Sequence, residues 1–552
     1  GNAPVISSLY PSSEEFTLFF LPRCSDGSTQ QGSAQCSPEI SSWTVTVSFG
    51  VVPKQVSSMI TPQQASCKPC AAFTGHLAGN CQNTIAQYGH SSQTVFCQSP
   101  VIGPIPNYIQ LTPSIATSFS SGLLSAAGIY PFHNVFLGEF MSPQVLRARY
   151  GVPDGLYGRA PSNSMSVAEF LGQFYNPEDL HIWHKIMGLP APAPVILIGP
   201  NNATEPGGEA SLGRFNFSFN VFSKTVPTNL LLLLCVDIQY IMGIAPNITT
   251  TFWSLGQLTN GQEPFLDWIT DILNSPNPPL VHSVSYADDE PSLSVEYMNR
   301  VDIEFIKAGA RGLSLFFAAG DNGVAASDPS APGCPGRFVP SFPSSSPHVT
   351  TVSGTQWSTQ ATPLCNLTGD GGTLSYQCST VQEIASSTLT GSRISTGGGF
   401  SDVFPRPSYQ DAWVKAYLVD YIDKKIPQSW YNASGRCYGD ISSSARNYPT
   451  MIGGELDSVD GTSAATPTIA ALVALINDVL LSSGRPPVGF INPALYSMPN
   501  THFFDVVLGN NKCPEDLQSC CPYGYDASPF FDPLSGRGTP HFSLLLDFFQ
   551  KL

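Results

Sequence analysis

Charged side chains are scarce in this chain of 552 residues: Asp, Glu, Lys and Arg make up 12% of it, against about a quarter in an average soluble protein. Positive charge is the scarcer sign, because 24 Lys and Arg stand against 40 Asp and Glu, a formal net charge of −16. Proteins that bind nucleic acid concentrate positive charge, so we expect no such partner. The acidic balance suits an acidic compartment and would equally serve solubility, so both explanations stay open.

Long hydrophobic runs are also missing. A membrane-spanning helix needs about 18 to 20 consecutive apolar residues. The most apolar stretch, residues 230–236, is far shorter, so the sequence predicts no membrane span. The chain starts at Gly1 without Met or a signal peptide, which is expected of a processed or truncated protein. At this length we expect two domains, or one large domain with an appendage.

The 14 cysteines fall into two groups, six before residue 100 and eight after residue 230. Both counts are even, which favours disulfides formed in an oxidising compartment. Cys67-x-x-Cys70 is alternatively a redox or metal pair, but no second CxxC or pair of histidines completes a zinc site. Sequons that predict N-glycans, in agreement with a secreted or lysosomal protein, stand at Asn202, Asn216, Asn247, Asn366 and Asn432.

The texture of the chain changes near residue 140. Residues 1–140 are rich in Ser, Pro, Gly and Cys, with alternating runs such as 43–49, and we interpret them as a β-rich extension or prodomain remnant. From 141 to 552, apolar β-type runs alternate with helical patterns, which predicts a doubly wound, mostly parallel sheet with helices on both faces. The expected strands are 195–198, 250–253, 281–286 and 313–318, and the clearest helices are 263–273 and 292–308.

The strongest motif is Asp460-Gly-Thr-Ser-Ala-Ala-Thr-Pro467, followed by an apolar run of small residues. It predicts a tight turn that leads into a buried helix with Ser463 at or near its start. Free backbone N–H groups and the helix dipole favour negative charge there, so a serine is well placed as a nucleophile. An ordinary Ser/Thr helix cap is the alternative on local physics alone.

Gly461-Thr-Ser-Ala-Ala-Thr-Pro467 resembles the nucleophile motif shared by subtilisins and sedolisins. Subtilisins need a catalytic histidine, and none of the nine histidines lies in a His-Gly-Thr setting, whereas sedolisins use Glu and Asp. Gly207-Gly-Glu-Ala-Ser-Leu212 and Asp237-Ile-Gln-Tyr-Ile241 resemble two parts of the sedolisin acid motif. Residues 316–323, 261–266, 284–290 and 397–409 add matches. Over residues 141–552 the chain is similar to the sedolisin family of serine-carboxyl peptidases, nearest the tripeptidyl-peptidase I branch.

This resemblance implies a subtilisin-like fold and an acid-acting peptidase that releases tripeptides from free N-termini of polypeptides. It implies Ser463 as the nucleophile and Glu209 as the general base, worth roughly 10² to 10⁴ in rate. Asp237 would orient Glu209 and share its charge, so the two acids should titrate as a pair with one pKa raised. Asp321 would stay protonated and donate to the oxyanion.

The acid motif is interrupted, which is the chief departure from the family. The residue after Leu212 should be Asp and is Gly213, so residues 213–236 resemble an insertion. Uninterrupted, the two acids would stand at i and i+4 of a helix, with Cβ atoms about 5 to 6 Å apart. A retained intron and a genuine insertion both explain the segment. Unless residues 213–236 loop out and return Asp237 to the same helical turn as Glu209, the active site is incomplete. The alternative function is therefore a catalytically impaired sedolisin-fold glycoprotein with a binding or structural role.

The resemblance also implies one structural Ca²⁺ ion near the C-terminus, held by two Asp side chains and backbone carbonyls, an oxygen set that suits this ion. The ligands that it implies are Asp505, Val506, Ser528, Phe530 and Asp532. In a competing alignment, Gly524-Tyr-Asp526 supplies Asp526 as the second Asp ligand in place of Asp532. The motif Pro533-Leu-Ser-Gly-Arg-Gly-Thr-Pro540 directly follows Asp532 and favours it.

Overall fold

A computed structural model describes four strands in residues 1–139 and, beyond them, residues 140–202, 234–255, 264–327, 334, 336–358, 365–368, 375–378, 383–515 and 520–552. Contacts between Cα atoms divide the chain into two compact units, Gly1–Ile109 and Gln110–Leu552. The insertion at 213–236 lies outside the described residues, except that its last three residues, from Leu234, begin a helix. The boundary near residue 140 stays a prediction.

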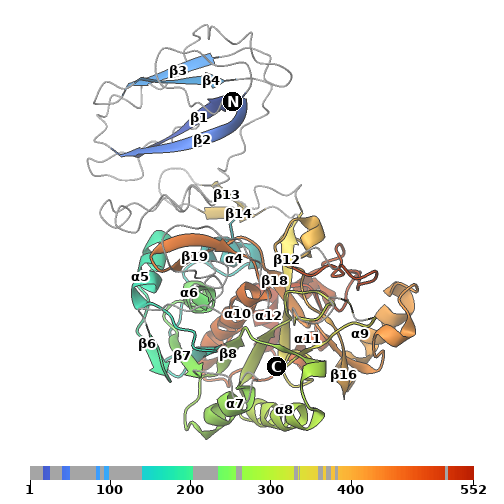
Figure 1. Ribbon diagram of the computed structural model, residues 1–552. Helices are drawn as coiled ribbons and strands as arrows, with labels where there is room; N and C mark the ends of the chain where they lie inside the picture. Colours follow the sequence, from blue (N-terminus) through green and yellow to red (C-terminus); the bar gives the residue numbers. More distant parts are fainter. Residues whose placement is uncertain are drawn as a thin grey trace. The chain divides into compact units, whose positions relative to one another are not determined.

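The first unit contains two antiparallel strand pairs (Figure 1). β1 (Phe16–Cys24) pairs with β2 (Ile40–Phe49), and β3 (Gln82–Gln87) pairs with β4 (Gln93–Gln98). The alternating run at 43–49 is therefore a strand, as the sequence predicts. The residues of this region that the structure describes thus all lie in strands, and the β-rich character of the whole region stays a prediction.

The second unit is built on an eight-stranded sheet in the order β15-β12-β10-β8-β5-β7-β6, with β18 also pairing β12. All these pairs are parallel except β12 with β15. The strands are β5 (Ser164–Phe170), β6 (Val195–Ile198), β7 (Thr249–Leu255), β8 (Val281–Val284), β10 (Ser314–Ala318), β12 (Thr350–Trp357), β15 (Glu383–Ala385) and β18 (Ile441–Ser444). The mostly parallel sheet is thus confirmed, and each of the four predicted strands is present.

Short two-stranded ribbons surround this sheet. They pair β9 (Asp288–Asp289) with β11 (Ser341–Phe342), β13 (Cys365–Thr368) with β14 (Ser375–Cys378), β16 (Gly399–Pro405) with β17 (Gly435–Tyr438), β19 (Tyr448–Ile452) with β20 (Glu455–Val459), and β21 (Phe503–Phe504) with β22 (Thr539–Pro540). The ribbon of β19 and β20 matters most for the site, because β20 ends just before the predicted nucleophile turn.

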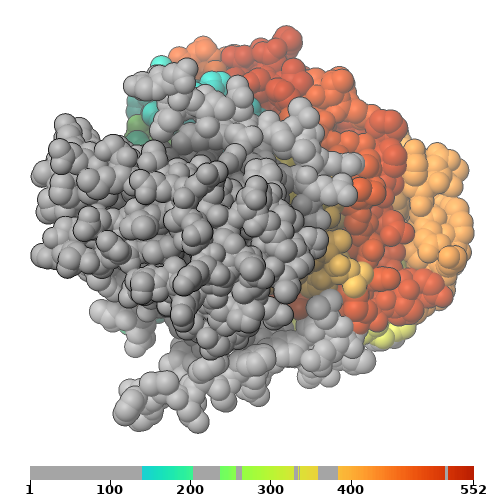
Figure 2. Space-filling view, turned by 90° about the horizontal axis from the view of Figure 1, so that it is seen from above, coloured from blue at the N-terminus to red at the C-terminus, as the bar shows by residue number. Residues whose placement is uncertain are grey.

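Helices cover both faces of the sheet, as predicted. α7 (Phe265–Asn274) and α8 (Val295–Ala310) lie on one side, and α6 (Leu234–Ile244) and α10 (Thr462–Ser482) on the other (Figure 1). The remaining helices are α4 (Pro143–Tyr150), α5 (Pro177–Ile186), α9 (Asp411–Ala416), α11 (Asn492–Ser497) and α12 (Phe542–Phe549). α9 projects at one edge of this unit and is seen in orange in Figures 1 and 2.

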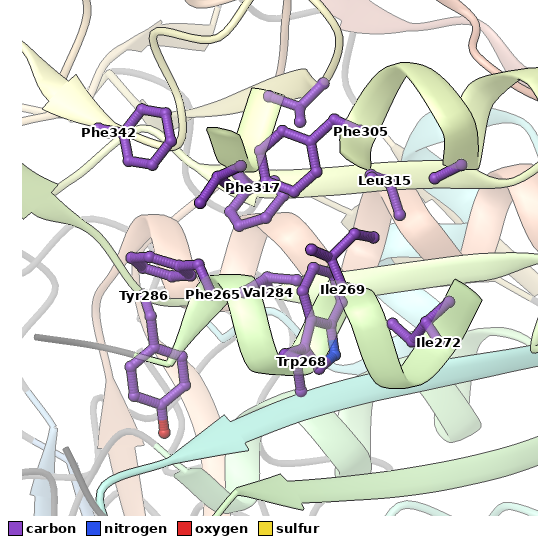
Figure 3. Close-up of a cluster of buried hydrophobic side chains, with 14 of the residues drawn as sticks. Phe265, Trp268, Ile269, Ile272, Val284, Tyr286, Phe305, Leu315, Phe317 and Phe342 are labelled. Atoms are coloured by element: carbon purple, nitrogen blue, oxygen red, sulfur yellow. The ribbon is translucent and has the colours of Figure 1, made fainter. Parts of the chain in front are cut away.

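The core beneath α7 shows why its sequence forms a helix. Phe265, Trp268, Ile269 and Ile272 recur at spacings of three and four, which places them on one helical face. All four are fully buried, and Figure 3 shows them against aromatic side chains that include Phe317 of β10. Burial of such side chains stabilises the fold by about 1.5 to 3 kcal/mol each. This layer holds β8 and β10, whose ends carry the candidate site.

α10 is the central helix of the unit. By length and composition its 21 residues could cross a membrane. In the fold, however, 89% of its most apolar window is buried inside the protein. It packs against α6 and against β5, β8, β10 and β12. It is therefore a core helix, and the described residues include no other helix of this kind.

Disulfides are present, as the cysteine count predicts. Cys334 bonds to Cys521 and Cys513 bonds to Cys520, so both bridges tie the C-terminal region together. Cys437 of β17 differs, because its thiol is free and fully buried. Burial raises the pKa of that thiol well above its ordinary value, so it is held in the neutral form.

Candidate active site

Ser463 is the second residue of α10, at the end that faces the carboxyl ends of the strands, where sheets of this kind bind ligands. The turn before it is anchored by Asp460, whose carboxylate accepts hydrogen bonds from the backbone N–H groups of Arg393 and Asn447, both at 2.9 Å. The Arg393 guanidinium also pairs with Asp460 at 2.8 Å. This buried acid therefore fixes the course of the chain into Ser463.

Asp237 is the fourth residue of α6 and is buried. Its Oδ1 atom accepts hydrogen bonds from the hydroxyls of Ser285, at 2.9 Å, and Ser283, at 3.3 Å. Burial raises the pKa of Asp237 to about 7, because the charged form loses its hydration, while the two serine donors pull in the opposite direction. The carboxyl is consequently neutral in acid and ionises near neutral pH.

Asp321 lies in the loop that follows β10, and its side chain caps α10 from a distance in sequence. Oδ1 of Asp321 accepts from both the backbone N–H and the hydroxyl of Thr462, each at 2.8 Å. Gly461, at the N-cap position, makes no side-chain cap. Burial raises the pKa of Asp321, the bonds from Thr462 lower it, and the negative charge of Asp460 raises it. With Oδ1 committed to two donors, Oδ2 is the oxygen left to carry a proton.

These three predicted residues meet at one place. The hydroxyl of Ser285, directly after β8, lies 2.9 Å from Oδ1 of Asp237 and 3.3 Å from the backbone carbonyl oxygen of Ser463. Asp321 holds Thr462, the residue next to Ser463. α6, the end of β8, the loop after β10 and the start of α10 thus converge. Glu209, the predicted base, lies outside the described residues.

Sequence reasoning did not single out Ser285, Ser283 or Thr462. The first two fall in or beside the matched stretch 284–290, and Thr462 lies inside the nucleophile motif, so each had a weak signal. Their polar contacts join residues 46, 48 and 141 positions apart in the chain. No local pattern reports contacts of that range.

A buried serine and histidine also pair in this sheet, away from Ser463. Nδ1 of His282 lies 2.6 Å from the hydroxyl of Ser166, and its Nε2 lies 2.8 Å from the carbonyl oxygen of Pro279. Burial lowers the pKa of His282 to about 4, so this ring is neutral. Within the described residues no hydrogen bond joins a histidine to Ser463.

The residues of the predicted calcium site also lie together, around a loop of residues 528–532 that we call the calcium loop. The N–H of Phe530 donates to Asp505 at 2.9 Å, and the N–H of Ser528 donates to Asp532 at 3.1 Å. Val506 is buried beside Asp505, whereas Asp526 is exposed. This geometry favours Asp532 over Asp526 as the second Asp side chain of the predicted calcium site.

The donor chemistry of this loop fits Ca²⁺. Phe530 has φ of +74°, a left-handed conformation that glycine favours, so the backbone keeps the course that a glycine would take. Asp532 is fully buried; burial raises its pKa to about 7, and hydrogen bonds from the backbone N–H groups of Ser528, Leu534 and Ser535 and from the Ser535 hydroxyl act in the opposite direction. The backbone carbonyl oxygen of Phe530 already accepts a hydrogen bond from Nη1 of Arg537, at 3.5 Å.

Comparisons with known proteins agree with this geometry. A model of the subtilase family matches residues 234–485. Tripeptidyl-peptidase 1 of Homo sapiens is 36% identical over 418 residues, or 74% of this chain and 64% of that protein. The Dictyostelium discoideum protein of the same name is 34% identical over 74% of this chain and 58% of that protein. Physarolisin of Physarum polycephalum is 34% identical over 75% of this chain and 69% of that protein.

A solved structure shows the same fold. One match is Pseudomonas sedolisin, a serine-carboxyl proteinase complexed with two molecules of pseudo-iodotyrostatin, with a TM-score of 0.53 and 20% identity. It covers 75% of this chain and 99% of the other. Fold and site thus define a subtilisin-like serine-peptidase architecture.

The chain belongs to the sedolisin family of serine-type peptidases, on its tripeptidyl-peptidase 1 branch. It spans about three-fifths of the length of the tripeptidyl-peptidase 1 relatives described above, 58% and 64%.

Proposed function

We propose that this chain is an acid-acting serine-carboxyl peptidase that releases tripeptides from free N-termini of polypeptides. The observation that carries the proposal is the convergence at the start of α10, where Asp237 is joined through Ser285 to the residue that bears the nucleophile. Asp321 caps the same helix turn. The name of the tripeptidyl-peptidase 1 relatives supports the substrate class.

In the first half of the reaction, the hydroxyl oxygen of Ser463 attacks the scissile carbonyl carbon. Glu209 takes the hydroxyl proton, and Asp237 orients Glu209 and shares its charge. Protonated Asp321 donates from Oδ2 to the oxyanion that forms, and the raised pKa of this acid keeps it protonated in acid. The amine leaves with the proton that Glu209 held, and the acyl group stays on Ser463.

The second half regenerates the enzyme. A water molecule attacks the acyl carbon and gives its proton to the acid pair. The serine oxygen leaves and regains a proton, which releases the carboxyl product. Ionisation of Asp321 removes the oxyanion donor, so the rate should fall as the pH rises through the pKa of this acid. We therefore propose work in a lysosome or an acidic extracellular setting.

Two further features belong to this proposal. One Ca²⁺ ion held by Asp505, Asp532 and the carbonyls of Val506, Ser528 and Phe530 would link two C-terminal segments and stabilise the fold. N-glycans at the sequons would suit secretion.

The test uses a fluorogenic tripeptide amide at about pH 4 to 5, offered with a free and with an acetylated N-terminus, beside an internally quenched longer peptide. We expect hydrolysis of the free form alone, and its loss in Ser463→Ala with an unchanged melting temperature. Cleavage of the longer peptide at internal bonds would instead indicate an endopeptidase. Folded protein with no turnover would favour the second candidate, a catalytically impaired glycoprotein, which the 28-position separation of Glu209 and Asp237 supports.

A further inference from the structure

The backbone carbonyl of Ser463 lacks its ordinary helical partner. In an α-helix this carbonyl accepts from the N–H of the residue four positions later. Here that residue is Pro467, which lies inside α10 and has no N–H. Ser463 is buried, so an unpaired carbonyl would be costly. The Ser285 hydroxyl lies 3.3 Å from this oxygen and can replace the missing donor.

Ser285 has a second acceptor within reach. Its oxygen lies 2.9 Å from Oδ1 of Asp237, yet a hydroxyl has only one hydrogen to donate. An ionised carboxylate accepts a hydrogen bond about twice as strong as a neutral group does. The hydrogen therefore goes to Asp237 when that acid is charged and is free to go to the carbonyl of Ser463 when the acid is neutral.

We propose that Ser285 is a positioning residue that couples the charge of Asp237 to the first turn of α10, through the carbonyl that Pro467 leaves without a helical donor. Neutral Asp237 releases the hydroxyl to hold Ser463 in place, and ionised Asp237 withdraws it. This inference rests on the proposed function for its effect on catalysis, but the hydrogen bonds themselves do not depend on turnover.

Ser283 provides a matched control. Its hydroxyl also donates to Oδ1 of Asp237, at 3.3 Å, and among the described residues no hydrogen bond joins it to the carbonyl of Ser463. Removing Ser283 or Ser285 takes a donor from the ionised carboxylate, so each change should raise the pKa of Asp237. Only Ser285 should be coupled to Pro467.

Other ionisable groups on the elements packed against α6, and those that hold the first turn of α10, are the same in every variant. They include Glu169 of β5, Arg147 of α4, Asp179 and His184 of α5, Tyr448 of β19, Asp321 in the loop after β10 and Asp460 before α10. Comparison between variants at a fixed pH therefore isolates the hydroxyl.

The first experiment is a double-mutant cycle in a Ser463→Ala background, which prevents autolysis and keeps the backbone carbonyl. Melting temperatures are measured for Ser285→Ala, Pro467→Ala and the pair, at about pH 5 and about pH 8. Ser285→Ala should lower the melting temperature by about 1 to 3 °C at pH 5, and Pro467→Ala, which restores the N–H, should remove most of that loss. At pH 8 the two changes should be additive.

The same cycle with Ser283→Ala should be additive at both pH values. Additive effects of Ser285→Ala and Pro467→Ala at pH 5, or equal coupling for both serines, would overturn the proposal. This readout needs no activity, so it stands even if the proposed function fails.

The second experiment measures hydrolysis with Ser463 in place. Ser285→Ala should lower kcat by at least roughly tenfold with little change in KM, and should move the limb of the pH profile that belongs to the acid pair to higher pH. Pro467→Ala should recover at least about threefold of that loss. Ser283→Ala should move the same limb of the pH profile to higher pH, and adding Pro467→Ala to it should recover no kcat. An unshifted profile in Ser285→Ala would contradict the coupling while leaving the peptidase assignment intact.

Discussion

Burial of Asp237 makes the stability of the fold depend on pH, and the change Asp237→Asn should remove that dependence. The pKa of this carboxyl is raised from 3.8 to about 7 in the folded protein. The folded state therefore holds a proton that the unfolded chain has already released. A raised pKa stabilises the fold fully below the unfolded value, and this stabilisation is lost as the pH rises through the folded value.

The size of the effect follows from the shift. Each pKa unit corresponds to about 1.4 kcal/mol, so a shift of roughly three units is worth about 4 kcal/mol. We expect the free energy of unfolding to fall by about that amount more in the parent than in Asp237→Asn between about pH 4 and pH 8. Buried acids that do not titrate as a pair with Asp237, such as Glu290, are present in both proteins and cancel in the difference.

The assay is urea unfolding followed by tryptophan fluorescence at several pH values, with both proteins in a Ser463→Ala background to prevent autolysis. Asparagine has the shape of the acid and does not titrate, so its packing should change little. If the two free-energy curves run parallel across this pH range, Asp237 does not hold a raised pKa and the reasoning is wrong. A control, Asp411→Asn, removes a partly exposed acid whose pKa is lowered by its partners Arg406 and Lys415, so it should not reduce the loss of stability toward pH 8.

Three more predictions concern other parts of the site. Deleting residues 213–236, which rejoins Glu209-Ala-Ser-Leu to Asp237, should speed tripeptide release in acid at least roughly a hundredfold, and equal rates in both forms would show that the segment already folds out of the way. Thr462→Val removes a hydroxyl that donates to Asp321, so the pKa of this acid should rise and the alkaline limb of the pH–rate profile should move to higher pH; a shift toward lower pH would contradict this. Excess chelator should lower the melting temperature, because Ca²⁺ on the calcium loop stabilises only the folded state, and an unchanged value would count against the site.

Much of the fold could be predicted because local pattern reports local structure. The run of Phe265, Trp268, Ile269 and Ile272 has the period of a helix, and α7 forms there with ends within two residues of the expected range. The four apolar runs became parallel strands. α10 was recognised from its motif.

The candidate site was predictable only as far as its motifs reach. Ser463 and Asp321 were chosen from stretches that resemble a family, and the structure brings both to the start of α10. The serine that bridges Asp237 and Ser463 was not predicted, because its contacts join residues 48 and 178 positions apart. Nor did the cysteine count reveal that Cys437 stays free, since pairing depends on which sulfur atoms meet.

By itself, then, the amino-acid sequence determined the sheet, the helices that cover it and the residue types that meet at its edge, since periodicity and motif are properties of neighbouring residues. Tertiary structure alone decided the protonation of these residues. Asp237 is an ordinary acid until α6 buries it against the end of β8, and Asp321 becomes the cap of α10 only when the loop after β10 reaches Thr462. Loss of water and the direction of a few hydrogen bonds set those pKa values, and both exist only once distant segments have packed.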